Sequence, residues 1–67
     1  MPSVLTKRER EVFELLIANK STHEIGDMLF ISEKTVRNHI SNVIQKLGVS
    51  CRTQAIVELI RMEEITL

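Results

Sequence analysis

Residues 31–48 constrain the fold of this chain most, because they contain the start, the body and the end of one helix. Ser32 is a favourable N-cap, since its hydroxyl accepts a hydrogen bond from a backbone N–H that has no partner within the helix. Gly48 is a favourable left-handed stop. Between them, apolar residues recur at helical spacing and therefore share one side of the helix. These residues are Val36, Ile40, Val43, Ile44 and Leu47.

The opposite side of this predicted helix is polar and has no carboxylate. It carries Lys34, Arg37, Asn38, Ser41, Asn42 and Gln45. The chain has nine Lys and Arg, nine Asp and Glu and no formal net charge, yet no acid occurs between Lys34 and Val57. A one-sided basic surface on a neutral chain indicates an anionic, hydrogen-bonding partner.

Length and composition predict one small, all-α domain spanning residues 1–67. Two Gly, one Pro and two Phe, with no Trp or Tyr, argue against a β-sandwich, a base-stacking platform or a haem pocket. A single cysteine forms no internal disulfide, and no apolar run approaches the length of a membrane span. We therefore expect a soluble, cytoplasmic protein without cofactor, small-molecule ligand or membrane contact.

Capping signals place the other helices. Thr6 with Glu9, and Ser21 with Glu24, form capping boxes in which side chains satisfy backbone donors at a helix start. Gly26 lies within the second helix, where it costs about 1 kcal/mol relative to Ala, so we expect close approach by a neighbouring helix. The predicted helices span residues 7–18, 22–29, 33–47 and 51–63.

The second and third predicted helices, with a three-residue turn between them, indicate a helix-turn-helix. Its steric requirements are an aliphatic and a small residue in the first helix, aliphatics flanking the turn, and a β-branched residue early in the second helix. Ile25, Gly26, Leu29, Ile31 and Val36 meet them. Phe30 stands in the turn, where the pattern favours Gly, so this match alone is moderate.

The whole pattern resembles the LuxR/FixJ-type DNA-binding domain of bacterial transcription regulators. The resemblance lies in LTKREREVFELL (5–16), EIGDMLFISEKTVRNHISNVIQKLGV (24–49) and RTQAIVELIR (52–61). Asn19 and Gly26 depart from the family, which often has Gly and Ala there. The resemblance implies a four-helix fold without a wing, the third helix in the DNA major groove, and a homodimer formed through the fourth helix. It also implies promoter binding that activates or represses transcription, with RNA polymerase as a further partner.

Within the family, the chain is most similar to stand-alone regulators of late spore-coat genes in endospore-forming bacilli. The alternative is the isolated effector domain of a longer response regulator. Another alternative is a protein-interaction module that docks on RNA polymerase or another regulator. The acid-free segment disfavours such a protein-interaction module. Salt-dependent binding to duplex DNA would distinguish a DNA-binding regulator from such a module.

The family resemblance assigns DNA contacts to this sequence. Base contacts are expected at Lys34, Arg37, Asn38 and Ser41, because Arg pairs with guanine and Asn with adenine. For Lys34, a phosphate contact is the alternative. Phosphate contacts are expected at Ser21, Thr22, Thr35, Asn42, Lys46 and Arg52. The competing interpretations are an ordinary solvated helix face, a capping role for Ser21, and a helix-dipole role for Lys46.

The last predicted helix is apolar on two faces, so it needs a partner besides the domain core. The dimer candidates are Thr53, Gln54, Val57, Ile60 and Arg61. The simpler interpretation is a mildly apolar surface. An isologous dimer would place two recognition helices one DNA turn apart, roughly 34 Å.

The sequence offers no constellation for catalysis or metal binding. His23, His39 and Cys51 lie far apart in the sequence, unlike the compact ligand pairs of zinc sites. Cys51 has no apparent base to activate it as a nucleophile. We therefore expect a binding protein rather than an enzyme.

Overall fold

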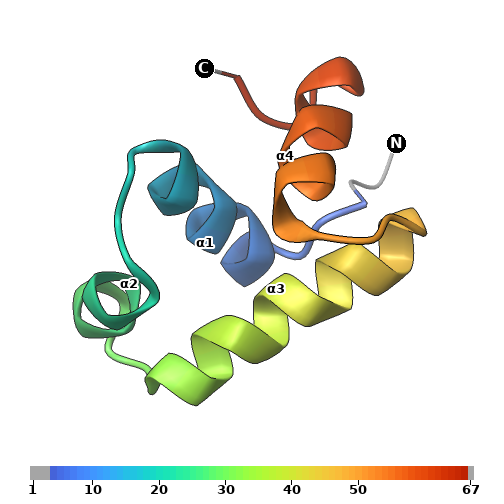
Figure 1. The fold of residues 1–67 in the computed structure, drawn as a ribbon. Helices are drawn as coiled ribbons and strands as arrows, with labels where there is room; N and C mark the ends of the chain where they lie inside the picture. The colour runs from blue at the N-terminus through green and yellow to red at the C-terminus, as the bar shows by residue number, and fades with distance from the viewer. Residues whose placement is uncertain (1–3, 67) are drawn as a thin grey trace.

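The computed structural model describes residues 4–66 as four α-helices joined by short connections (Figure 1). The helices are α1 (Lys7–Ile17), α2 (Thr22–Leu29), α3 (Glu33–Leu47) and α4 (Arg52–Arg61). No strand occurs within residues 4–66, so the fold there is all-α, as predicted. Residues 1–3 and 67 of the predicted domain lie outside the described residues.

The capping signals in the sequence form as predicted. Both capping boxes are present. The hydroxyls of Thr6 and Ser21 accept the backbone N–H of Glu9 and Glu24, and the backbone N–H of Thr6 and Ser21 donates in return to the carboxylates of Glu9 and Glu24. The Ser32 hydroxyl accepts the backbone N–H of Thr35 at 3.1 Å. These bonds satisfy donors that the first helical turn leaves without partners, and they fix the starts of three helices.

The last helix ends earlier than the sequence predicted. It spans Arg52–Arg61 instead of residues 51–63, because Glu63 takes a left-handed conformation with φ of 59°. The Glu64 N–H then donates to the carbonyl of Leu59 at 2.9 Å. This reversal returns the chain to the core, where Ile65 is 3% exposed. Similarly, α1 ends at Ile17, one residue before the predicted end.

The core lies between α3 and the other three helices. Val36, Ile40 and Val43 of α3 are buried, while Ile44 and Leu47 are partly buried at the edge of the same stripe. The other buried apolar residues are Leu5, Val12, Phe13, Ile25, Ala55, Leu59 and Ile65. The apolar side of α3 is thus covered, as its spacing predicted.

The turn between α2 and α3 is tight. A Cβ atom at Gly26 would lie 2.8 Å from the carbonyl oxygen of Ile31. The close approach expected at Gly26 therefore exists, but it comes from the turn backbone and the start of α3. Phe30 ends α2 in the left-handed conformation, with φ of 59°, and is 94% exposed. Phenylalanine thus stands where glycine would be least strained.

No helix among the described residues combines the length and the hydropathy that crossing a bilayer requires.

Candidate nucleic-acid interface

Within residues 4–66, no other helix covers the outer side of α3. Figure 1 shows α1, α2 and α4 on one side of α3, with the opposite side open along its length. The predicted base-contact residues Lys34, Arg37, Asn38 and Ser41 are all exposed there. Their spacing of three and four residues brings them onto one strip of helix surface. We call these four residues, with Asn42 and Gln45, the α3 outer face.

The start of α3 carries a hydrogen-bonded network that the sequence analysis missed. Glu33 Oε2 accepts from Thr22 Oγ1 at 2.8 Å and from Arg37 Nη1 at 2.9 Å. The Thr22 hydroxyl and then the Arg37 guanidinium hold the pKa of the Glu33 carboxyl below its usual value. The signal in the sequence was local, because Glu followed four residues later by Arg is a favourable helix pair.

The other end of α3 is tied to α1. Lys46 Nζ donates to the carboxylate of Glu9 and, at 3.0 Å, to the carbonyl of Val4. Glu9 is only 4% exposed. Its burial raises the pKa of the carboxyl, but the bonds from Lys46 and Thr6 outweigh burial, so the pKa is below its usual value. Lys46, which the sequence predicted to contact a DNA phosphate, therefore has a partner within the fold.

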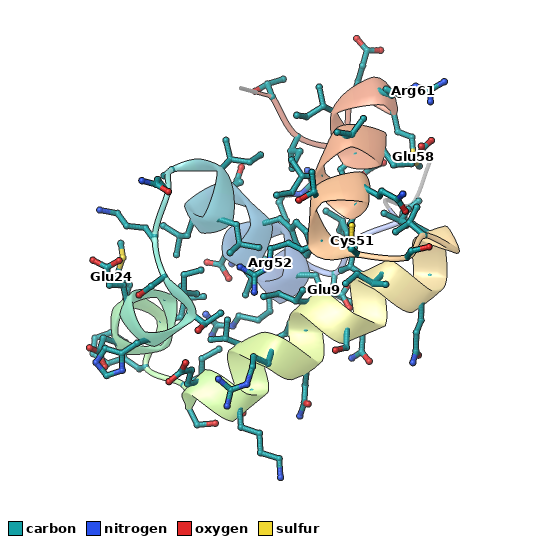
Figure 2. The ribbon with its side chains drawn as sticks, in the orientation of Figure 1. Glu9, Glu24, Cys51, Arg52, Glu58 and Arg61 are labelled. Carbon is teal, nitrogen blue, oxygen red and sulfur yellow. The ribbon has the colours of Figure 1, made fainter. Side chains whose placement is uncertain are left out.

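Several hydroxyls expected at phosphate are also engaged within the chain. Ser21 Oγ accepts the N–H of Glu24 at 3.1 Å, and the hydroxyls of Thr35 and Ser32 lie 2.9 Å apart. By contrast, Asn42 and Arg52 are exposed, and Figure 2 shows Arg52 at the start of α4. Asn42 and Arg52 are therefore the more available candidates for phosphate.

The acid-free segment of the sequence is not acid-free in space. Two of its four cations are paired, since Arg37 contacts Glu33 and Lys46 contacts Glu9. Within residues 4–66, Lys34 and Arg52 are in no ion pair of this kind. These two side chains carry the uncompensated positive charge of the segment.

The predicted dimer face of α4 is less apolar than its sequence indicated. Val57 is 51% exposed, whereas Ile60 is partly buried and packs against the core. Gln54 Oε1 accepts the backbone N–H of Ser50 at 2.9 Å. Arg61 lies 3.8 Å from Glu58, at the end of α4 remote from α3 (Figure 2). The exposed apolar group of this face is thus Val57, while Thr53, Gln54 and Arg61 are exposed polar residues around it.

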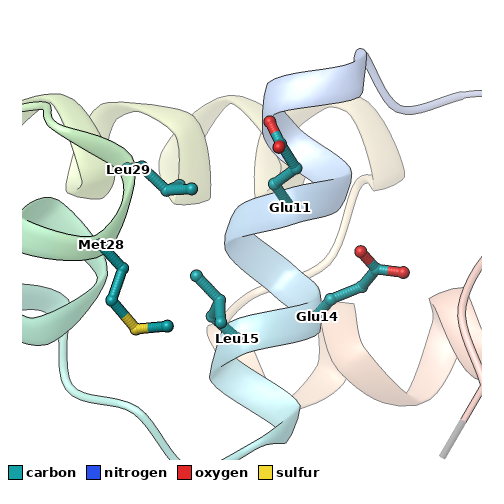
Figure 3. Close-up of a pocket in the computed structure, with 5 residues that line it drawn as sticks. All are labelled: Glu11, Glu14, Leu15, Met28 and Leu29. Atoms are coloured by element: carbon teal, nitrogen blue, oxygen red, sulfur yellow. The ribbon is translucent and has the colours of Figure 1, made fainter.

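A small pocket lies between α1 and α2, away from the α3 outer face (Figure 3). Its volume of about 230 Å³ is below the roughly 300–1,000 Å³ that is usual for ligand pockets. Its lining consists of Glu11, Glu14, Leu15, Met28 and Leu29. Among the described residues, His, Cys, Asp and Glu form no group of three or more that could hold a metal ion.

Residues 3–59 match the family model described as bacterial regulatory proteins, luxR family. The chain belongs to the luxR family. It is 70% identical over 64 residues to the spore germination protein GerE of Bacillus subtilis (strain 168), covering 96% of this chain and 86% of GerE. A solved structure of the transcription factor GerE matches with a TM-score of 0.95 and 63% identity, over 97% of both chains.

A longer relative shares the same domain. The chain is 53% identical over 58 residues to the transcriptional regulatory protein DegU of Brevibacillus brevis, covering 87% of this chain but 25% of DegU. The match to the GerE structure confirms the four-helix luxR-type fold expected from the sequence. As a member of this family, the chain is a DNA-binding transcription regulator.

Proposed function

We propose that this luxR-family regulator binds duplex DNA sequence-specifically as a homodimer, with α3 of each subunit in the major groove. The α3 outer face carries this proposal. It is exposed along its length, it has no carboxylate of its own, and it presents side chains that match base edges. The chain acts in this proposal as a single cytoplasmic domain, by binding and without a catalytic step.

Phosphate contacts dock the protein and base contacts select the site. Lys34 and Arg52, the unpaired cations of the segment, and Asn42 hold the backbone. The first turn of α2, from Thr22 onward, offers further backbone N–H donors, while the N–H of Ser21 donates to Glu24 and its hydroxyl lies beside that turn. In the groove, Arg37 binds guanine O6 and N7, Asn38 binds adenine, and Ser41 contacts a neighbouring base. Thr35 and Lys46 are secondary phosphate contacts, because both have partners within the fold.

Dimerisation uses α4 in this proposal. The exposed Val57 packs against its copy around a two-fold axis, with Thr53, Gln54, Ile60 and Arg61 around it. A chain of this length buries a small core, so a second copy adds stability. The two recognition helices then read half-sites one DNA turn apart, roughly 34 Å.

Similarity to GerE supports a role in sporulation. We propose that the chain regulates late sporulation genes, including spore-coat genes, and that it contacts RNA polymerase where it activates them. The match to 86% of GerE is the support for a regulator of this kind. The match to a quarter of DegU is the corresponding support for the effector domain of a longer regulator.

Salt-dependent duplex binding tests the proposal. If Lys34 and Arg52 of both subunits contact phosphate, about four contacts are made, and log K against log salt has a slope of about −3.6. Arg52→Ala should make this slope shallower by about 2 in the dimer, equally on all DNA sequences. Arg8→Ala is the matched control, because Arg8 lies on α1 and pairs with Glu11. A chain that binds polymerase but no duplex would contradict the proposal.

A further inference from the structure

We propose that Glu33 is a positioning residue for base recognition, holding the guanidinium of Arg37 in place for its base. This inference rests on the proposed function and deepens it. One oxygen, Glu33 Oε2, accepts both the Thr22 hydroxyl at 2.8 Å and Arg37 Nη1 at 2.9 Å. The network joins the first residue of α2 to the first residue and the second turn of α3.

The network leaves Arg37 able to read a base. A guanidinium has five N–H donors in a fixed planar fork, and Glu33 engages it through Nη1. The remaining donors of the fork stay available for a guanine edge. Arg37 is exposed on the α3 outer face and contacts no other carboxylate among the described residues. Glu33 therefore restrains the side chain without occupying the whole fork.

A carboxylate at this place opposes DNA binding by charge alone, since it lies beside a surface that must approach phosphates. It lowers affinity for every sequence equally. Its advantage is preorganisation, because a long side chain fixed before binding loses less freedom when it binds. Glu33 also neutralises the charge of Arg37, which weakens the attraction of Arg37 to phosphates and so disfavours non-specific complexes. Glu33 thus exchanges general affinity for selectivity.

The Thr22 hydroxyl is what distinguishes Glu33 from an ordinary surface acid. An exposed helix pair at this spacing is weak and mobile by itself. The bond from Thr22 anchors the carboxylate from the neighbouring helix, so Arg37 is held relative to both helices of the helix-turn-helix. The sequence predicted that Thr22 contacts a DNA phosphate. Anchoring Glu33 is a second role for its hydroxyl.

The test compares the binding of wild type, Glu33→Gln, Arg37→Ala and the double variant to a preferred duplex and to its single-base substitutions. Arg37→Ala identifies the base pair that Arg37 reads, where a bidentate contact gives about 5- to 150-fold discrimination. Glu33→Gln should lower discrimination at that same base pair by about threefold to tenfold, a part of the full arginine contribution. It should leave the other positions unchanged and raise affinity for unrelated duplex.

Two further variants keep the result interpretable. Glu11→Gln removes an arginine-paired carboxylate from α1, and it should change neither discrimination nor non-specific affinity. Thr22→Val removes the anchoring hydroxyl, and it should lower discrimination at the Arg37 base pair without removing a charge. Thermal unfolding of each variant shows that it is folded at the assay temperature.

In the double variant, the effect of Glu33→Gln on discrimination should disappear, because Glu33 acts through Arg37. Loss of discrimination at a different base pair, additive with Arg37→Ala, would show that Glu33 reads a base itself and would overturn the proposal. Unchanged discrimination in Glu33→Gln would overturn it too. Failure of the proposed function is distinct, since the wild type would then bind no duplex.

Discussion

Lys46 at the end of α3 donates to the carboxylate of Glu9 in α1, across 37 positions of sequence. The same carboxylate receives the backbone N–H of Thr6 in the capping box. One buried acid therefore fixes both the start of α1 and the packing of α3 against it. The Lys46 ammonium, predicted from sequence as a phosphate contact, therefore has partners within the fold, although its side chain remains 35% exposed.

Replacing Lys46 should destabilise the domain. Lys46→Met keeps the aliphatic stem but leaves the Glu9 carboxylate buried without its cation. Full loss of a buried partner costs about 3–5 kcal/mol, and the partial exposure of Lys46 reduces this to about 1–2 kcal/mol. Urea unfolding measures the change. Arg8→Met, which breaks an exposed pair with Glu11, should change stability by less than about 0.5 kcal/mol. Equal effects of the two substitutions would contradict this role of Lys46.

The pH dependence of stability should follow the lowered pKa of Glu9. Its pKa in the folded chain is below the ordinary value of 4.5, so the folded state favours the ionised form. The stabilisation is therefore complete above about pH 4.5 and is lost as the pH falls through the lower, folded value. Glu24, held by Ser21, and Glu33, held by Thr22, contribute with the same sign.

The contribution of Glu9 is isolated by measuring the unfolding free energy of wild type and of Glu9→Gln over an assay range of about pH 2 to 6. The variant should lose less stability on acidification, because its amide does not titrate. Identical acid dependence of the two proteins would show that Glu9 contributes nothing to it.

Arg37→Ala should weaken binding to the preferred duplex by about 1–3 kcal/mol and relax preference at one base position. The reason is loss of the bidentate contact to guanine. Fluorescence anisotropy with a set of single-base duplexes measures both effects. Arg8→Ala is the control for the removed charge. An equal loss on all duplexes would identify Arg37 as a phosphate contact instead.

Gly48→Ala should destabilise the domain by about 1–2 kcal/mol, the cost of the left-handed conformation for a residue with a Cβ. Gly48 has φ of 67°, and a Cβ there would meet no atom within 4 Å. The cost is therefore conformational and not a clash. Chemical denaturation measures it, and unchanged stability would mean that the turn after α3 rearranges freely.

Phe30→Gly should have the opposite effect on stability from Gly48→Ala and should stabilise the domain. Phe30 is also left-handed, and at 94% exposure its side chain contributes almost no packing. Relief of about 1–2 kcal/mol of strain exceeds the roughly 0.5–1 kcal/mol of entropy that glycine costs. The domain should therefore gain about 0.5–1 kcal/mol in thermal or urea unfolding. A loss of stability would show that the Phe30 ring packs in solution.

Local signals in the sequence predicted much of the fold. The capping boxes at Thr6 and Ser21 and the stop at Gly48 depend on residues a few positions apart, so the bounds of α2 and α3 could be read directly. The apolar stripe of α3 followed from its period. The same spacing identified the exposed strip that carries Arg37.

Contacts between distant positions could not be read in this way. Lys46 with Glu9, and Arg10 with Glu64 at 2.9 Å, join residues that become neighbours only after the helices pack. Ile65 follows Glu63, whose left-handed conformation reverses the chain direction. The burial of Ile65 depends on this reversal, which helical periodicity in the sequence does not predict. The charge of the candidate interface consequently depends on acids outside the acid-free segment.

Selection of binding sites from a random duplex pool is the decisive test of sequence-specific DNA binding by an α4-linked dimer. We expect enrichment of two inverted half-sites with centres about one helical turn apart. Selection with Arg37→Ala should lose the preference at one position in each half-site and retain the spacing. Recovery of no common sequence would rule out sequence-specific binding, and recovery of single half-sites without a fixed spacing would rule out the α4-linked dimer.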